Sequence, residues 1–116
     1  MSQTQFTMDV PINPIILPPA NNPEKEKNWL QKSLHKWLNE EFITEEINRD
    51  IAERTAQVFM RQRMEGENDL GCLMIAIIIE MKSFDFSESF YGEFEIANSV
   101  SDLLVKSLDF DKYCGQ

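Results

Sequence analysis

The sequence predicts an all-α protein, a compact bundle of about four helices that follows an extended, proline-rich N-terminal arm. Three observations predict this fold class. All five prolines lie within the first 23 residues, where they exclude a helix because proline lacks a backbone donor and restricts its neighbour. Later segments repeat apolar residues at helical spacing, and one segment is apolar for longer than a typical buried strand. We therefore expect an arm over residues 1–22 and a helical bundle domain over residues 23–116.

Composition places the chain among globular proteins and limits its partners. The 116 residues suffice for one domain, and hydrophobic residues make up 42% of them. The net charge of −9 is concentrated in the second half, since residues 65–116 hold 11 acidic and three basic side chains. A surface of that sign repels phosphate, so we expect no nucleic-acid partner. It suits either a basic protein partner or solubility alone.

The N-terminal segment and the cysteines predict a cytoplasmic protein. The segment MSQTQFTMDV has neither the basic residues nor the apolar core of a signal peptide. Two cysteines are too few for a disulfide framework, and Cys72 lies in an apolar run, where a free cysteine usually acts as a small hydrophobe. That run is shorter than the roughly 20 apolar residues of a membrane span, so no membrane contact is expected.

The arm carries more large apolar side chains than a plain linker. Its composition alone fits either a disordered tail or a segment docked on the bundle. The apolar side chains are interspersed with prolines, and Ile15, Ile16 and Leu17 form the densest group. We expect these three residues to pack against the bundle or against a neighbouring subunit.

The first helix is predicted over residues 23–40. Asn22 can cap its start, and Pro23 suits the first helical position because its missing N–H needs no partner there. A mostly apolar stripe then follows at helical spacing. Its members are Trp29, Leu30, Ser33, Leu34, Trp37 and Leu38.

A second helix is predicted between Thr44, a capping residue, and Gly66, a residue that ends helices. One face repeats at helical spacing, and neighbouring small and aromatic residues widen it. The widened face consists of Ile47, Ile51, Ala52, Thr55, Ala56, Val58, Phe59 and Gln62. Arg61 and Arg63 fall in the last turn, where positive charge suits the helix dipole.

The third predicted helix, Leu70–Ser83, has no polar face. Asn68 or Asp69 can cap it. Its isoleucines also favour a buried strand, but an apolar segment of about 12 residues exceeds the usual strand length. A helix that is apolar nearly all round must be surrounded, so we expect the central element of the bundle here. Its expected core residues are Leu73, Ile77 and Met81.

A polar and aromatic join links this segment to the last helix. Asp85, Ser87 and Ser89 are turn and capping residues, and Gly92 interrupts any helix that begins before it. Beyond the glycine, apolar residues return at helical spacing, which predicts a fourth helix over about residues 93–108.

No pattern in the sequence indicates catalysis, a metal or a cofactor. His35 is the single histidine and has no nucleophile placed beside it by the sequence. Zinc needs four ligands at characteristic spacing, whereas His35, Cys72 and Cys114 are three scattered ones. Calcium-loop, di-iron and phosphate-loop motifs are missing as well. We therefore expect a non-enzymatic protein without a cofactor.

The candidate binding residues are aromatic and arginine side chains. Aromatic residues crowd the join, where they either close the end of the core or line a groove for a partner peptide. Arg61 and Arg63 either pair with the acidic side chains of residues 65–69 or hold a carboxylate, such as a partner's C-terminal end. We hypothesise that the join, from Phe84 to Phe94, walls a peptide groove with one of these arginines near its rim. The candidate partner-binding residues are Arg61, Arg63, Phe84, Phe86, Phe90 and Tyr91.

Two stretches, RQRMEGENDLG (residues 61–71) and FDFSESFYGEFEIANSVSDLL (residues 84–104), resemble a family of small acidic cyanobacterial proteins. Within that family the likeness is to the factors that assist carboxysome shell assembly, and it covers about residues 56–104. The resemblance implies a non-enzymatic protein that holds the C-terminal extension of a hexameric shell protein until assembly. No functional residues can be assigned from this resemblance, so the candidate residues are argued from surface chemistry alone.

Two functional classes stay open. The first is a protein-binding assembly factor or chaperone-like adaptor that holds the peptide tail of a partner in an apolar groove. The second is an acidic regulator that self-associates as a homo-oligomer and masks a basic partner protein. Groove binding should survive high salt, whereas charge masking should fade as the screening length shortens to a few ångströms.

Overall fold

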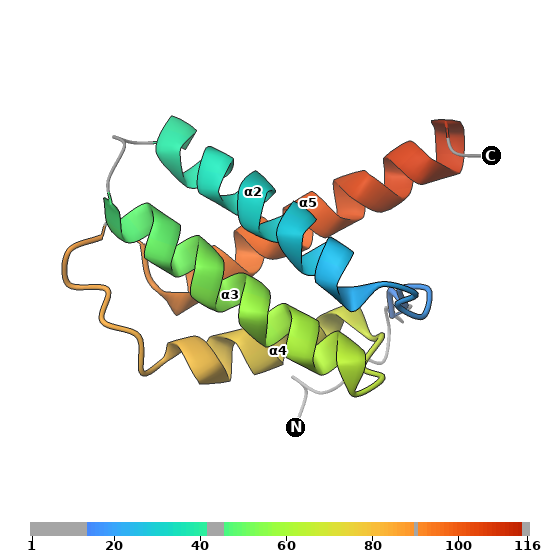
Figure 1. Ribbon diagram of the computed structural model, residues 1–116, viewed down its shortest axis with the longest axis horizontal. Coiled ribbons are helices and arrows are strands. Elements are labelled where there is room, and N and C mark those ends of the chain that lie inside the picture. The colour runs from blue at the N-terminus through green and yellow to red at the C-terminus, as the bar shows by residue number, and fades with distance from the viewer. Residues whose placement is uncertain (1–13, 42–45, 90, 115–116) are drawn as a thin grey trace, which may run out of the picture.

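The computed structural model describes residues 14–41, 46–89 and 91–114, with only the backbone given for residues 109–114. Its helices are α2 (Pro23–Glu41), α3 (Glu46–Met64), α4 (Leu70–Met81) and α5 (Glu93–Cys114) (Figure 1). Across these described residues there is no β-strand, only an isolated bridge between Ile16 and Asp69. The predicted all-α fold class is therefore confirmed. The first 13 residues of the predicted arm lie outside the described residues.

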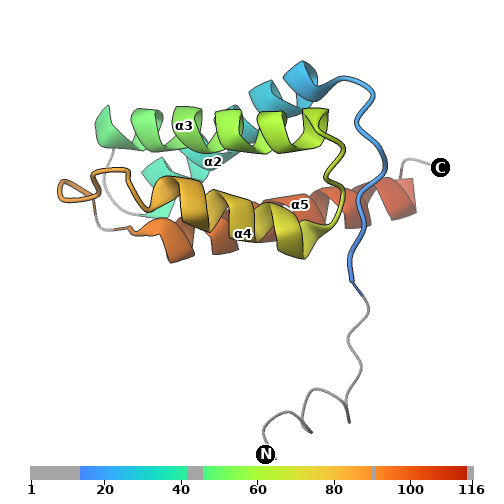
Figure 2. The ribbon, with the colours of Figure 1, turned by 90° about the horizontal axis from the view of Figure 1, so that it is seen from below.

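The four helices of the described chain form two layers. α2 packs along α3, and α4 packs along α5, so each layer holds two helices that are consecutive in the chain (Figure 2). α3 lies against α4, and α2 crosses α5, which joins the two layers. The core fills the space between the layers. Its fully buried side chains include Leu30, Leu34, Leu38, Ile51, Phe59, Leu73, Ile77, Met81, Ile96 and Val100.

The helix ends follow the local signals of the sequence. The side chain of Asn22 accepts the backbone N–H of Lys25 at 3.1 Å, and Pro23 is the first residue of α2, as predicted. Asp69 caps α4, because its Oδ1 accepts the N–H of Cys72 at 3.1 Å. Gly66 has a φ of 92°, a left-handed conformation that other residues rarely adopt, and it ends the α3 segment. The predicted cap Thr44 lies outside the described residues.

The last helix is longer than predicted. The carboxylate of Glu95 accepts the N–H of Gly92 at 2.8 Å, and the carbonyl of Gly92 accepts the N–H of Ile96, which fixes the start of α5. The predicted end near residue 108 is wrong, since α5 continues to Cys114. The segment from 109 to 114 contains no glycine or proline that would end a helix, and the next glycine is Gly115.

α4 is buried on one side only, which corrects the prediction of a surrounded central helix. Leu73, Ile77 and Met81 are fully buried, as predicted. On the opposite side, however, Ile75 is 57% exposed and Ile79 is 62% exposed. The reason is the two-layer architecture, in which α3 and α5 cover the inner side of α4 and no described element covers its outer side (Figure 2).

Cys72 also departs from the prediction. It was expected to act as a small hydrophobe within the apolar run, but it is exposed on the outer side of α4. The pKa of its thiol is raised chiefly by the negative charge of Glu67, with smaller contributions from partial desolvation and from Asp69. A run of apolar letters therefore does not by itself indicate a run of buried side chains.

Candidate functional site

Arg63 is the most heavily engaged polar side chain of the described structure. It lies in the last turn of α3 with a side chain only 3% exposed, and its Nε donates to Oε1 of Glu26 at 3.0 Å. Its Nη1 donates to Oδ1 of Asn68 at 2.6 Å, and its Nη2 donates to the carbonyl of Pro18. Arg63 thereby joins the arm, α2, α3 and the loop before α4. We call Arg63 together with Glu26, Asn68 and Pro18 the Arg63 hub.

The hub holds the arm against the loop before α4. The N–H of Leu17 donates to the carbonyl of Asn68 at 2.8 Å, and the N–H of Leu70 donates to the carbonyl of Ile15 at 2.8 Å. These two hydrogen bonds flank the antiparallel bridge between Ile16 and Asp69.

Only part of the predicted arm packing is therefore found. Leu17 is buried in the core cluster, but Ile15 and Ile16 are exposed. Successive side chains of an extended backbone point to opposite sides, which explains why Ile16 faces away when Leu17 faces the core.

Beside the hub, the arm, α2, α3 and α5 border an open hollow of about 680 Å³. We call it the arm groove. Its apolar lining comes from four segments: Leu17, Pro18 and Pro19 of the arm, Trp29 of α2, Phe59 of α3, and Leu104 and Leu108 of α5. Its polar lining comes from Asn21, Asn22, Lys25, Glu26 and Ser107. The groove is thus a mainly apolar hollow with a few polar groups at its edge.

Trp29 and Lys25 are two side chains of the arm groove that are available to contact a ligand. Trp29 remains 38% exposed although it lies on the wall of the groove, so a large aromatic surface is available to a ligand. The carboxylate of Glu26 is engaged by Arg63, and within the described residues Lys25 forms no ion pair. The charged group left to meet a ligand is accordingly a lysine in a protein of net charge −9.

Arg61 and Arg63 do not pair with the acidic side chains that the sequence suggested. Arg61 forms an ion pair with Glu80 of α4 at 3.4 Å, and Arg63 forms one with Glu26 of α2. Both partners are distant in sequence, because the arginines project toward neighbouring helices. The loop before α4 offers Arg63 only the carbonyl of Glu67 and the side chain of Asn68. Arg63 is a buried structural residue rather than the rim of an open site.

Part of the aromatic join closes the end of the core, which was one of the two alternatives, whereas Phe94 at its end is 60% exposed. Tyr91 is buried, and its hydroxyl donates to the carbonyl of Leu38 at 3.3 Å. Its ring centroid lies 5.6 Å from that of Trp37. Phe84 and Phe86 are half-buried against the core, with ring centroids 4.9 Å apart. Phe90 lies outside the described residues.

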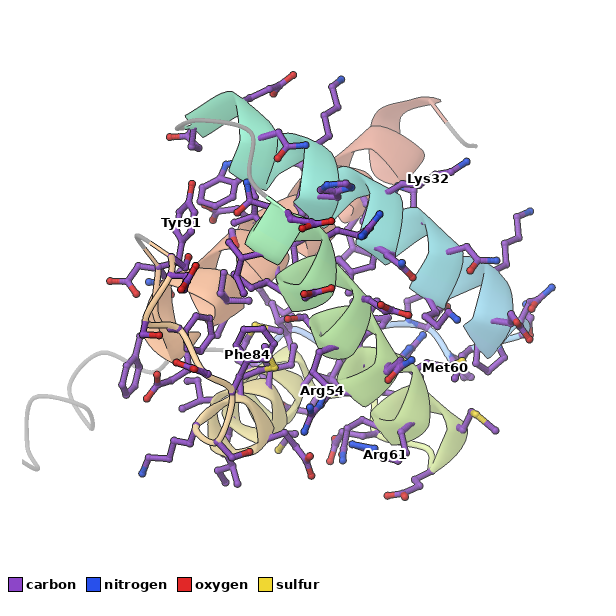
Figure 3. All side chains as sticks on the ribbon, turned by 60° about the vertical axis from the view of Figure 1, so that its left-hand side comes forward. Lys32, Arg54, Met60, Arg61, Phe84 and Tyr91 are labelled. Carbon is purple, nitrogen blue, oxygen red and sulfur yellow. The ribbon has the colours of Figure 1, made fainter. Side chains whose placement is uncertain are left out.

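The structure does not bring Arg63 and the join together. Arg63 holds α2 at Glu26, whereas Tyr91 holds it at Leu38, 12 residues further along the same helix. At 1.5 Å per residue, those positions are about 18 Å apart. Arg61 likewise lies near the C-terminal end of α3, well away from Tyr91 (Figure 3). Tyr91 and Arg63 therefore do not lie in one local site.

The residues that do line a hollow were missed by sequence reasoning. Trp29 was placed in the mostly apolar stripe of the first helix, and Leu104 and Leu108 lie within the fourth predicted helix. One signal was present, namely the apolar side chains among the prolines of the arm, which indicated a docked segment. Which helices it would contact depends on the tertiary arrangement.

Neither a metal site nor a membrane span is found in the described residues. Among them, no three His, Cys, Asp or Glu side chains are grouped so that they could hold a metal ion. None of the described helices combines the length and the apolar character needed to cross a membrane.

Fold and site together define a small two-layer helical protein with an apolar groove beside a docked arm. The chain belongs to the family of a domain of unknown function (DUF8822), whose model matches residues 10–108. The match covers the docked arm, all the groove-lining residues and the two layers. No curated protein and no solved structure matches the chain.

Proposed function

We propose that this protein is a non-enzymatic protein-binding adaptor, an assembly factor or chaperone-like protein that holds a peptide segment of a partner. The observation that carries the proposal is the arm groove, with an apolar floor and a partly exposed tryptophan on its wall. Exposed tryptophans beside apolar hollows are typical binding hot spots, because they supply a large contact area at low entropic cost.

The chemistry of the groove favours a peptide tail. Its volume lies within the range of small-ligand sites, about 300–1,000 Å³, which suits a few residues of extended chain rather than a folded domain. Lys25 at its edge can hold a carboxylate, such as a C-terminal end, by a charge-assisted hydrogen bond. The resemblance to carboxysome shell assembly factors suggests a specific partner for this role, the C-terminal extension of a hexameric shell protein.

A non-enzymatic role is consistent with the polar groups of the groove. Glu26 is committed to Arg63, and Asn22 is committed to the start of α2. Lys25 and Ser107 are the remaining groups with reactive chemistry in the described lining, and neither has a general base hydrogen-bonded to it there. The groove supports binding better than bond cleavage.

The test uses peptides that correspond to the C-terminal extension of a shell hexamer, together with a displayed library of random peptides. Isothermal titration calorimetry measures binding to the full chain and to Trp29→Ala. We expect the substitution to weaken binding by roughly thirtyfold, the usual effect of removing an aromatic hot spot, while the variant stays folded at the temperature of the titration. Met64→Ala is the matched control, since Met64 is an exposed apolar residue outside the groove. Equal affinities of the wild type and Trp29→Ala would contradict the proposal.

The second candidate function is the self-associating acidic regulator that masks a basic protein. It is favoured by the excess of acidic residues beyond position 65. A salt series on any captured complex separates the two candidates. Binding by the groove should persist at high ionic strength, whereas masking by charge should be lost.

A further inference from the structure

We infer that the outer side of α4 is a second docking surface, distinct from the arm groove, which binds a basic amphipathic helix of a partner protein. The inference rests on the exposed apolar residues Cys72, Ile75 and Ile79, which we call the α4 stripe. It is independent of the proposed function, because none of the three residues lines the arm groove.

The α4 stripe is continuous along the helix. Its members are three and four residues apart, so they align on one side, opposite the buried Leu73 and Ile77. Met74 and Ile78 are half-buried and widen the apolar surface toward the core. A surface helix of a monomeric protein usually carries polar residues on its outer side, so this side is built for contact with another apolar surface.

The arm extends the apolar surface past the N-terminal end of α4. Ile16 is 57% exposed, and its bridge to Asp69 places it beside the residue that caps α4. Residues opposite each other in an antiparallel bridge point to the same side. The carboxylate of Asp69 reaches the N–H of Cys72, so Ile16 lies on the side where the α4 stripe begins.

The segment that contains the α4 stripe carries an excess of negative charge, although one of its acids, Glu80, is paired with Arg61. Between residues 65 and 88 the chain holds one base, Lys82, against six acids: Glu65, Glu67, Asp69, Glu80, Asp85 and Glu88. Two of these acids act on the stripe itself, since Glu67 and Asp69 both raise the pKa of the Cys72 thiol. A ligand of this surface therefore meets an apolar centre with Glu67 and Asp69 beside its first turn, which we call the acidic border.

Charge complementarity identifies the occupant. A helix with one apolar side and lysine or arginine on its flanks would place its apolar side on the α4 stripe and its cations beside the acidic border. A second copy of this chain fits less well, because two-fold pairing would bring the acidic residues of both copies together. Only Lys82 and the Arg61 that pairs with Glu80 would offset them in each copy. α4 is 12 residues long, about 18 Å, which matches roughly three turns of a partner helix.

The experiment uses a synthetic probe and the full chain. The probe is a fluorescein-labelled peptide of about 18 residues, long enough to form a helix, with leucines on one side and lysines on the flanks. One control peptide has the same composition in an order that breaks the apolar side, and another carries glutamates in place of the lysines. Fluorescence anisotropy measures all three. We expect the probe to bind at least tenfold more tightly than either control.

Variants assign the binding to the α4 stripe. The double substitution Ile75→Ser with Ile79→Ser should weaken probe binding at least tenfold. Met64→Ser and Trp29→Ala should not change it, so failure of this inference and failure of the arm groove are distinguishable. Circular dichroism checks that the double variant keeps its helices, which we expect because both isoleucines are exposed.

Four results would overturn the inference. Equal binding of the probe and the rearranged peptide would mean unspecific charge attraction. Unchanged binding by the double variant would place the probe elsewhere. Sedimentation showing a wild-type dimer that the double variant dissolves would make a second copy the occupant, and uncharged lipid vesicles bound only by the wild type would make it a membrane surface.

Discussion

α3 and α4 lie against each other, yet they relate sequence to burial in opposite ways. α3 is rich in charged residues and buries eight of its 19 residues, including Asn48, Thr55 and Arg63. α4 is the most apolar segment of the chain and buries four of its 12 residues. The spacing of apolar residues, rather than their number, decides how much of a helix the core takes up. The apolar side chains of α4 that are not buried in the core therefore remain at the surface.

The strongest way to test this comparison is a pair of matched substitutions on the two sides of α4. Ile77→Asp should unfold the protein, because an unpaired charge in the core costs several kcal/mol, a large part of the stability of a small domain. Ile75→Asp should change the free energy of unfolding by no more than about 1 kcal/mol, since Ile75 is mostly exposed. Urea unfolding followed by circular dichroism measures both. Similar losses in the two variants would show that the outer side of α4 is covered.

The next largest effect concerns the two arginines at the end of α3. Arg63→Ala should lower the free energy of unfolding by about 2–4 kcal/mol, because it leaves Glu26 without its partner and the carbonyl of Pro18 without its donor. The range is below that of a fully buried pair, since Glu26 keeps a third of its side chain exposed.

Arg61→Ala is the control for Arg63→Ala. Its ion pair with Glu80 is half-exposed, so removing it should cost less than about 1 kcal/mol. Chemical denaturation of both variants provides the measurement. If Arg61→Ala proved the more damaging substitution, the assignment of Arg63 as the residue that joins arm, helices and loop would be wrong.

A smaller effect should be seen in the reactivity of Cys72. Negative charge on Glu67 disfavours the thiolate and raises the thiol pKa, so Glu67→Gln should lower that pKa. At a pH below the thiol pKa, a lower pKa increases the fraction of thiolate, which is the reactive form. Alkylation by iodoacetamide at pH 7.5 should therefore become severalfold faster. The experiment is made in a Cys114→Ser background, with Glu65→Gln as the control. A thiol that reacted only under unfolding conditions would contradict the exposed position of Cys72.

The smallest effect is expected inside α3. Thr55 is fully buried, and within the described structure its hydroxyl has no hydrogen-bond partner. Thr55→Val keeps the branched shape and removes the unsatisfied hydroxyl, so stability should rise by about 0.5–1 kcal/mol. Thermal unfolding by calorimetry is sensitive enough to detect this change. A loss of stability would reveal a partner for the hydroxyl.

Local features of this fold could be predicted from the sequence, and long-range ones could not. The caps Asn22 and Asp69 and the turn at Gly66 depend on neighbouring residues, so their signals were readable. Leu73, Ile77 and Met81 followed from helical spacing. The exposed side of α4 was missed because a helix that is apolar nearly all round contains no contrast to show which side faces the core.

The candidate site was harder to predict because it is assembled from distant segments. Arg63 meets Glu26, 37 residues away, and nothing in either segment specifies that pairing. The arm groove combines residue 17 with residue 108. Tyr91 was placed correctly in an aromatic cluster, but the choice between core and groove depended on its hydrogen bond to Leu38, which requires the packing of α2.

The two hydrogen bonds between the arm and the loop have a consequence for exchange of amide protons with solvent. Because the amide of Leu17 points to the loop and the amide of Leu70 points to the arm, detachment of the arm exposes both at once. The two amides should then exchange with the same opening free energy, as members of one cooperative unit below global unfolding. The amide of Leu73 donates to Asp69 within the start of α4 and should keep its protection during that event.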